Sequence, residues 1–224
     1  MRIPFTKYGL PQVVLYPLLL CVLKIVLFLV FWPALWLIPV QVVLFITQIW
    51  ALSFFRDPLR SILPDECVLY SPADGVITGI ERVEDSTLGS AALKISIFLS
   101  VFNVHINRLP CSVRIENVTY KKGRFINAMS GQASRINESN NILMVRLNDP
   151  KDRLLVRQIS GAIARHIVCE AKENDEYRQG EAFGMIKFGS RTELYIPDTS
   201  NYEVTVKAGD KVRAGINPLV RIKP

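Results

Sequence analysis

Charge is almost absent from the first quarter of the sequence, where Lys24 is the only charged residue between Leu10 and Phe55. This apolar stretch is too long for the hydrophobic part of a secretory signal peptide, and no small-residue cleavage site follows it. We therefore predict a membrane anchor that the mature protein retains. The polar and charged residues that a soluble domain needs begin only at Arg56.

The anchor has room for two helices of about 20 residues each, with a break around Trp32-Pro33. Basic residues at both outer ends predict that both ends lie in the cytoplasm; they are Arg2 and Lys7 before the stretch, and Arg56 and Arg60 after it. Pro39 can bend or shorten the second helix. A re-entrant hairpin, or one lying on the membrane surface, therefore stays open as the alternative to two spans.

Cysteines at zinc-binding or redox spacing are also lacking. The four cysteines are widely scattered, at Cys21, Cys67, Cys111 and Cys169, so we predict no metal site. Reduced cysteines that pack as small apolar residues fit a domain facing the cytoplasm.

Runs of basic residues interleaved with aromatic ones are missing as well. Although the net charge is +7, this absence argues against a nucleic-acid partner. Three of the positive charges lie in the first 55 residues, where there is no acid. The excess in the remainder suits an anionic lipid surface, and an ordinary solvated face explains it equally well.

Short alternating segments dominate the sequence after a polar, proline-bearing linker that ends near Glu66. Such segments are typical of strands, and we expect them at Cys67–Tyr70, Ala92–Val101 and Ala162–Cys169. The predicted fold is a mainly β (α+β) domain over residues 59–224, preceded by an α-helical membrane hairpin over residues 1–58.

An internal repeat joins two segments, Lys172–Gly180 and Lys207–Gly215, which share Lys, Asp, Arg and Gly in register. Each copy is typical of a turn and short strand in a barrel-sandwich-like hairpin of the kind that biotinyl and lipoyl domains contain. Neither copy carries a lone lysine at an exposed tip, so we do not expect a swinging cofactor arm.

A polar stretch covers Lys121–Ala128 and Ser134–Asn141. Its length favours a functional loop, and a solvated surface loop is the alternative.

Three places in the soluble part carry groups suited to chemistry. Gly189-Ser190 lies between two alternating segments, where a turn is the ordinary interpretation, although a glycine also leaves its carbonyl open to the neighbouring hydroxyl. His105 follows a buried strand, and a lone histidine is more often structural than catalytic. Asp74 lies in the turn Ala73-Asp74-Gly75, where supporting the turn is its commonest role.

Several motifs nevertheless occur in one order along nearly the whole chain, and together they resemble the short form of the phosphatidylserine decarboxylase proenzymes. The motifs are Ser-Pro-Ala-Asp-Gly at 71–75, Phe-Leu-Ser at 98–100 with His105 and Leu109-Pro110, Gly-x-Phe-x-Asn-Ala at 123–128, Asn-Glu at 137–138, and Phe-Gly-Met-Ile-Lys-Phe-Gly-Ser at 183–190. A set of spaced motifs is much more specific than any single one.

The resemblance implies that Ser190 attacks the carbonyl of Gly189 and that the chain is cut between them. The products would be a β chain, residues 1–189, and an α chain, residues 190–224, capped by a covalent pyruvoyl cofactor made from Ser190. This group would form a Schiff base with the amine of phosphatidylserine and accept the electrons released with CO₂. His105 would supply a proton to give phosphatidylethanolamine.

The resemblance also implies a setting. The substrate would be phosphatidylserine in the cell (inner) membrane, with the catalytic domain on the cytoplasmic side. The α and β chains would form a heterodimer, and a higher homo-oligomer stays open.

The chain departs from the family pattern at Arg108. Longer members carry a second histidine at this place, which joins an aspartate and the serine in self-cleavage. Asp74 and Ser190 match the other two members. We favour His105 as the base for both steps, oriented by Asp74, and Asp74 acting directly or through water is the alternative.

Two other functions remain as hypotheses. The same enzyme could act on another serine phospholipid, such as an ether-linked one. A membrane-anchored barrel-sandwich adaptor without catalytic activity would require a long coiled-coil hairpin within the domain, and no sustained heptads occur between Arg56 and Pro224.

Overall fold

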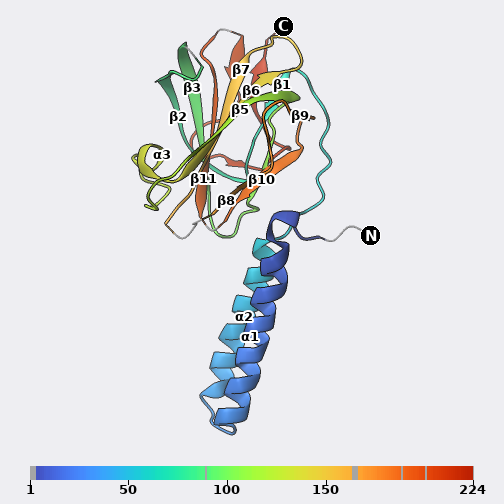
Figure 1. Ribbon diagram of the computed structural model, residues 1–224, viewed down its shortest axis with the longest axis vertical. Helices are drawn as coiled ribbons and strands as arrows, with labels where there is room; N and C mark the ends of the chain where they lie inside the picture. Colours follow the sequence, from blue (N-terminus) through green and yellow to red (C-terminus); the bar gives the residue numbers. More distant parts are fainter. Residues whose placement is uncertain (1–3, 89, 163–165, 188, 200, 224) are drawn as a thin grey trace. The chain divides into compact units, whose positions relative to one another are not determined.

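The computed structural model describes residues 4–88, 90–162, 166–187, 189–199 and 201–223. The chain forms two compact units, residues 1–59 and residues 60–224. Figure 1 shows the first as a helical hairpin and the second as a β domain. This confirms the predicted fold class, a mainly β (α+β) domain preceded by an apolar helical hairpin.

The hairpin consists of a short 3₁₀ turn, η1 (Lys7–Gly9), and two long helices, α1 (Leu10–Phe31) and α2 (Leu37–Phe54). The break falls at Trp32-Pro33 as predicted, because α1 ends at Phe31. Pro39 lies in the first turn of α2, where its missing N–H costs no helical hydrogen bond, so it does not interrupt the helix.

Both helices are long and apolar enough to cross a membrane. At 22 and 18 residues, they span about 33 and 27 Å, close to the roughly 30 Å of a bilayer's hydrocarbon core. Their side chains face outward over most of their length, which suits a lipid environment better than an aqueous one.

Lys24, the single charge of the apolar stretch, lies between the two helices. Its Nζ donates to Gln48 Oε1 at 2.6 Å, while Gln41 Nε2 donates to the Lys24 carbonyl at 2.9 Å. Gln48 also donates to Cys21 Sγ at 3.4 Å. These bonds hold the helices in register where water is scarce, which explains the few polar residues in this stretch.

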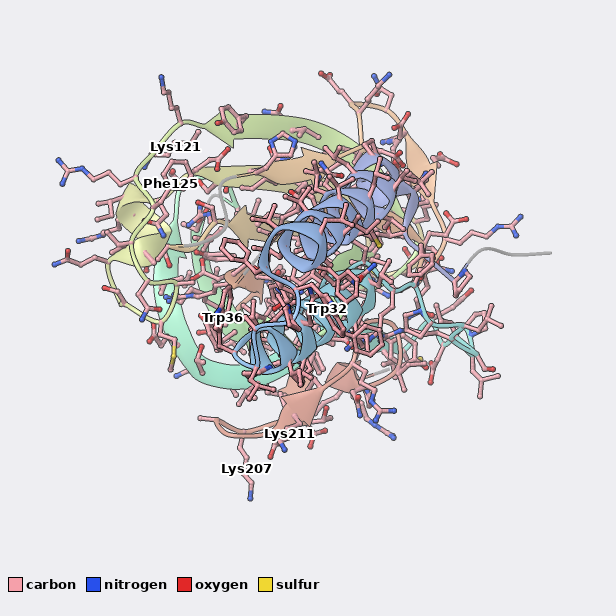
Figure 2. The ribbon with its side chains drawn as sticks, turned by 90° about the horizontal axis from the view of Figure 1, so that it is seen from below. Trp32, Trp36, Lys121, Phe125, Lys207 and Lys211 are labelled. Carbon is pink, nitrogen blue, oxygen red and sulfur yellow. The ribbon has the colours of Figure 1, made fainter. Side chains whose placement is uncertain are left out.

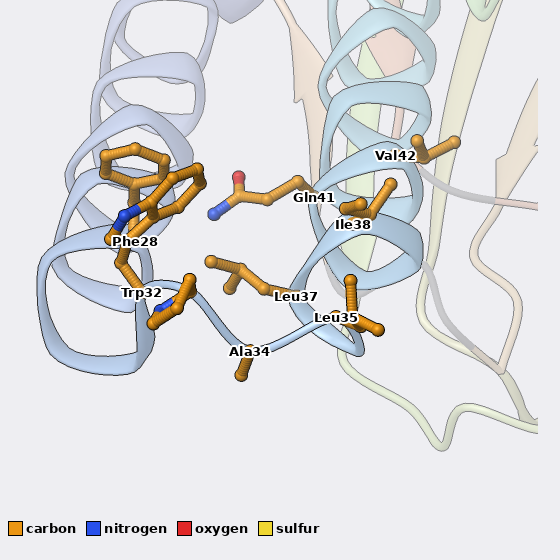
Figure 3. A pocket seen from close by; sticks show the side chains of 9 residues that line it. Phe28, Trp32, Ala34, Leu35, Leu37, Ile38, Gln41 and Val42 are labelled. Atoms are coloured by element: carbon orange, nitrogen blue, oxygen red, sulfur yellow. The ribbon is translucent and has the colours of Figure 1, made fainter.

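A pocket of about 430 Å³ opens near the turn of the hairpin. Figure 3 shows Phe28 of α1, and Trp32 just after it, facing Leu37 and Gln41 of α2 across the pocket. No ionisable side chain lines this pocket, so it offers no acid, base or nucleophile.

The β domain is built from antiparallel pairs in three open sheets. The largest has the order β13-β2-β3-β11-β7-β6-β5-β9, and two small sheets have the orders β1-β14-β12 and β4-β10-β8. The strands are β1 (Val68–Tyr70), β2 (Gly75–Asp85), β3 (Ser90–Leu99), β4 (Ile106–Arg108), β5 (Val113–Lys121), β6 (Ser139–Arg146), β7 (Arg153–Ile159), β8 (Ile167–Cys169), β9 (Glu176–Tyr177), β10 (Ala182–Ile186), β11 (Ser190–Pro197), β12 (Tyr202–Val204), β13 (Lys211–Val212) and β14 (Pro218–Ile222).

Alternation along β11 and β3 builds the core. Leu194 and Ile196 of β11 pack with Ile95, Ile97 and Leu99 of β3 in the main apolar cluster. Because successive side chains of a strand point to opposite faces, Ser190 and Thr192 lie on the same face of β11 as Leu194. Arg191, Glu193 and Tyr195 lie on the other face.

The internal repeat is confirmed as a structural repeat. In each copy the first lysine N–H bonds the aspartate three residues later, at 2.9 Å for Lys172–Asp175 and for Lys207–Asp210. Each turn then leads into a two-residue strand, β9 or β13. Gly180 and Gly215, which end the copies, have φ of 77° and 71°, a left-handed conformation that favours glycine.

Two expectations about element boundaries are wrong in part. Of the strand expected at Ala162–Cys169, only β8 forms in the described part, and residues 163–165 lie outside it. The polar loop also ends earlier than expected, because Ser139–Asn141 already belong to β6. Their side chains alternate between polar contacts on both faces, which hides the strand pattern in the sequence.

The loop between β5 and β6 carries α3 (Ala133–Ile136), the one helix in the described residues from Arg60 onward. At four residues it is far from the coiled-coil hairpin that the adaptor hypothesis requires. Figure 2 shows Lys121 and Phe125 beside this part of the ribbon, well separated from Lys207 and Lys211 of the second repeat copy.

Candidate functional site

The Gly189-Ser190 bond lies where the chain enters β11. Phe188 falls outside the described residues, Gly189 has φ of 67°, and Ser190 is the first residue of the strand. A side chain at 189 would meet open space, with Val101 Cγ1 at 3.9 Å. Glycine is therefore favoured here for its left-handed backbone conformation and not for lack of room.

The hydroxyl of Ser190 is buried and makes no hydrogen bond to the described residues. The residue has 0% of its surface exposed, and its Oγ has no hydrogen-bond partner among the described residues. Nearly all buried polar groups are hydrogen-bonded, and those that are not often have a chemical role. Ser190 pairs with Leu99 of β3, so the strand ladder fixes the backbone that carries this hydroxyl.

His105 is fully buried beside the same bond. Its Nδ1 lies 2.9 Å from the carbonyl oxygen of Asn103, and its Nε2 accepts from the N–H of Gly189 at 3.4 Å. A carbonyl can only accept and an amide N–H can only donate, so these contacts select the neutral tautomer with hydrogen on Nδ1. The basic nitrogen thus lies at the N–H of Gly189, on the N-terminal side of the Gly189-Ser190 bond.

This arrangement differs from the expected one, in which Asp74 orients His105. The backbone carbonyl of Asn103 takes the Nδ1 hydrogen. Asp74 Oδ2 instead accepts from Arg60 Nη2 at 2.7 Å, and Asp74 Oδ1 accepts from the N–H of Ala214 at 2.8 Å. These two bonds direct the Asp74 carboxylate toward Arg60 and Ala214.

Asp74 still lies at the correct end of the large sheet. It precedes β2, whose Val76 pairs with Phe98, and the next residue of β3, Leu99, pairs with Ser190. Two strand spacings of about 4.8 Å therefore separate the backbones near Asp74 and Ser190, roughly 10 Å.

Breaking the Arg60–Asp74 pair should weaken the domain. Both side chains are nearly buried, at 7% and 10% exposed. We expect Arg60→Met to lower the free energy of unfolding by about 3 to 5 kcal/mol, because it leaves a buried carboxylate without its countercharge. Chemical denaturation in detergent measures the change in free energy, with far-UV circular dichroism as the signal of unfolding.

The matched control is Arg82→Met, which removes the Arg82–Asp198 pair. The arginine of that pair is 78% exposed, so its loss should cost less than about 1 kcal/mol. Equal effects from the two variants would contradict a buried, energetically important Arg60–Asp74 pair.

A buried amide network joins the segment before Asp74 to β11. Asn107 Nδ2 lies 3.0 Å from Thr192 Oγ1 and 3.3 Å from the Pro72 carbonyl. Gln158 Nε2 donates to Asn107 Oδ1 at 2.9 Å. These bonds hold β4 against the large sheet, which fixes His105, one residue before β4, beside the start of β11.

Arg108, at the place of the family's second histidine, has a structural contact. Its side chain is buried, and Nη1 donates to the Gly180 carbonyl at 3.1 Å. Its Cδ lies next to the position that a Cβ on Gly215 would occupy. Arg108 therefore ties the ends of the two repeat copies to β4.

The opposite face of β11 carries a buried charged cluster. Glu193, which has 0% of its surface exposed, pairs with Arg191 and accepts from Ser134 Oγ at 2.6 Å and from the Tyr195 hydroxyl at 2.7 Å. Burial alone would raise the pKa of Glu193, but Arg191 and these two hydrogen bonds outweigh burial and lower it. The carboxylate stays ionised and anchors the strand.

Lys187, two residues before Gly189, was not singled out from the sequence. It is buried, and loss of solvent around it lowers the pKa of its ammonium group. The sequence did not indicate that Lys187 is buried, because a lysine in a strand with alternating polar and apolar residues usually points into solvent.

The structure therefore brings Ser190, Gly189 and His105 together and places Asp74 at the same end of the large sheet. Sequence reasoning missed Arg60 as the partner of Asp74 and Asn103 as the partner of His105. It also missed Gly161, whose Cα packs against the Gly189 carbonyl. None of these has a sequence signal beyond an ordinary loop residue, since each contact is made by tertiary packing.

The chain matches known proteins over most of its length. The family model described as phosphatidylserine decarboxylase matches residues 47–219. The chain is 44% identical over 180 residues to the phosphatidylserine decarboxylase proenzyme of Carboxydothermus hydrogenoformans, covering 80% of this chain and 83% of that protein. It is 38% identical over 222 residues to the proenzyme of Rhodopirellula baltica, covering 98% and 88% of the two chains.

A third relative, the proenzyme of Syntrophus aciditrophicus, is 46% identical over 167 residues, or 74% of this chain and 76% of that protein. The matched region contains the Gly189-Ser190 bond, His105 and Asp74, so the family resemblance drawn from the sequence motifs is confirmed. The chain belongs to the phosphatidylserine decarboxylase family, and it is a decarboxylase, a carboxy-lyase.

Proposed function

We propose that this carboxy-lyase cuts its own chain between Gly189 and Ser190 and uses the resulting pyruvoyl group to convert phosphatidylserine to phosphatidylethanolamine and CO₂. The observation that carries the proposal is the buried Ser190 hydroxyl without a partner, next to a left-handed glycine and the basic nitrogen of His105. The relatives are named proenzymes, which supports a chain that is processed.

Self-cleavage would begin with attack of Ser190 Oγ on the Gly189 carbonyl carbon. The new C–O bond replaces the C–N bond, which leaves an ester and a free amine on Ser190. Removal of the Ser190 Cα proton then expels the Gly189 carboxylate and leaves dehydroalanine. Its imine form reacts with water and releases ammonia, so the α chain begins with a pyruvoyl group.

His105 is the base that we assign to the first step. Its Nε2 accepts from the Gly189 N–H and would exchange that bond for the Ser190 proton. Nδ1–H donates to the Asn103 carbonyl, so the ring keeps its orientation while it takes the proton. Asp74, bonded to Arg60 and Ala214, would hold those two segments in place and add negative charge at this end of the large sheet.

The site fits a group carried at position 190. A pyruvoyl carbonyl would occupy space now taken by a hydroxyl without a partner, on the apolar face that Leu99 and Leu194 line. When present, the group supplies a carbonyl that combines with an amine and withdraws the electron pair released with CO₂. In the same reaction His105 would hold a proton for the carbon that loses CO₂.

The two chains would stay together after cleavage. β11 pairs with β3 and β7, β13 pairs with β2, and β14 pairs with β1. Each of these pairs joins a strand of residues 190–224 to a strand of residues 1–189. We therefore propose an αβ heterodimer, anchored by residues 1–58 in the cell membrane with its catalytic domain, residues 59–224, facing the cytoplasm.

Intact mass spectrometry of protein purified from membranes tests the proposal. We expect two chains that end and begin at the Gly189-Ser190 bond, with the small chain blocked to N-terminal sequencing by the pyruvoyl group. Finding only the uncut chain in catalytically active preparations would refute the mechanism.

A further inference from the structure

The residue that packs against the Gly189 carbonyl is Gly161, which follows β7. A Cβ built on Gly161 would lie 1.9 Å from the Gly189 carbonyl oxygen and 3.0 Å from its carbon. The next nearest atom, Ala128 Cβ, is at 3.4 Å, close to an ordinary van der Waals contact. The carbonyl of the bond to be cut therefore fills the space that a side chain at 161 would need.

Backbone conformation gives Gly161 no other reason to be glycine. Among the glycines that the structure describes, those in the left-handed region are Gly180, Gly189, Gly209 and Gly215, and Gly161 is not one of them. The φ of Gly161 therefore does not require glycine, whereas the approach of the Gly189 carbonyl excludes a side chain.

Asn137 fixes the position of Gly161 through the preceding residue. Asn137 is fully buried, and its Nδ2 donates to the carbonyls of Ser160 and Ile126, both at 2.8 Å. The Ser160 N–H and hydroxyl donate to the Glu138 carbonyl at 3.0 and 3.1 Å. The chain entering Gly161 is thus held by three hydrogen bonds at Ser160.

The loop that carries Asn137 also binds Arg191, the residue after Ser190. Arg191 Nη2 donates to Ser134 Oγ at 2.8 Å, and Nη1 lies 3.5 and 3.4 Å from the carbonyls of Ala128 and Ser130. The segment 126–137 is therefore bonded both to the residue after Ser190 and to the residue before Gly161. This connection gives a physical role to the motif residues at 123–128 and 137–138.

We infer that Gly161 is a positioning residue for self-cleavage. Its bare Cα lets the Gly189 carbonyl lie against residue 161, and Asn137 holds the preceding residue, Ser160, in place. The carbonyl carbon then stays in reach of Ser190 Oγ, and no side chain covers it. This inference rests on the proposed self-cleavage, and it concerns the first step, formation of the ester.

The test compares full-length wild type with Gly161→Ala and measures the rate at which newly made chain is converted to two chains. A methyl group at 161 must push the carbonyl aside, and misplacing a reacting atom by about 1 Å can cost on the order of 10²-fold in rate. We expect a slowing of that size. Gly131→Ala is the matched control, because a Cβ there meets nothing within 4 Å.

Hydroxylamine adds a measurement that separates a block at ester formation from a block at a later step. It attacks an ester at Gly189 and releases a small chain that starts with an unblocked Ser190. We expect folded Gly161→Ala to give little of this chain, because the ester does not form. A large yield would overturn the inference, since the ester would have formed despite the methyl group.

Gly180→Ala serves as a control for damaged packing, because its Cβ would lie 2.5 Å from Ile62 and its φ is 77°. It should be destabilised and still cut itself. If Gly161→Ala does not fold, Asn137→Ala takes its place: slowed cleavage in a folded domain supports the inference and wild-type cleavage overturns it. If wild-type protein stays uncut, the proposal of self-cleavage itself is refuted. If Gly161→Ala is cut at the normal rate, only the proposed role of Gly161 is refuted.

Discussion

Replacing Ser190 by alanine is expected to leave one full-length polypeptide without decarboxylase activity. The hydroxyl is the only group at this position that can form the ester, and without it neither the cut nor the pyruvoyl group can arise. Gel electrophoresis of the purified protein and release of CO₂ from carboxyl-labelled phosphatidylserine measure the two losses. Wild-type activity in this variant would refute the role of Ser190.

The variant should fold normally, which separates a chemical effect from a structural one. The Ser190 hydroxyl has no hydrogen-bond partner among the described residues, so its removal leaves no donor or acceptor unsatisfied. Far-UV circular dichroism and the denaturation midpoint should match those of the uncut wild-type chain. Ser96→Ala is the matched control, a buried serine in the adjacent strand β3, and it should cut and decarboxylate as wild type does.

The sequence predicts the hairpin well because its signal is local. Twenty or more apolar residues on either side of Trp32-Pro33 leave a chain little choice but two helices, and the helices end within a few residues of that break. The repeat is equally local: the Lys-to-Asp turn bond and the final glycine conformation both lie within nine residues.

The site is predicted less completely, because its partners come from distant parts of the chain. Asp74 and Ser190 follow from motifs, but Arg60 reaches Asp74 from the linker and Ala214 reaches it from the second repeat copy. Gly161 meets Gly189 only after β7 and β11 have paired. Contacts of this kind depend on sheet order, which alternation within single strands does not specify.

The absence of a second histidine also gains a physical explanation. From the sequence, Arg108 leaves the family triad without its middle member. In the structure its guanidinium is committed to the Gly180 carbonyl, so it is not a substitute base. His105, by contrast, has its unprotonated Nε2 at the N–H of Gly189, next to the bond to be cut, and its tautomer is set by the Asn103 and Gly189 contacts.

His105→Ala is therefore expected to slow self-cleavage by roughly 10²- to 10⁴-fold, the usual contribution of a general base, and to abolish turnover in whatever chain is cut. Pulse-chase labelling gives the rate of cleavage, and decarboxylation is assayed on the cut fraction alone. Full cleavage with lost turnover would confine His105 to the decarboxylation step. Normal rates of both would remove it from the mechanism.

His166→Ala provides the control that makes this result specific, because the chain has only two histidines. The His166 side chain is exposed, and its one described contact is made by its backbone carbonyl, which accepts from the Lys187 N–H. Alanine keeps that carbonyl. We expect normal cleavage and turnover, since an exposed imidazole supported only through its backbone has neither the orientation nor the exclusion of water that Asn103 and burial give to His105. A loss in both variants would point to damaged packing around the β8–β10 pair, and a loss in His105→Ala alone would identify the buried ring as the base.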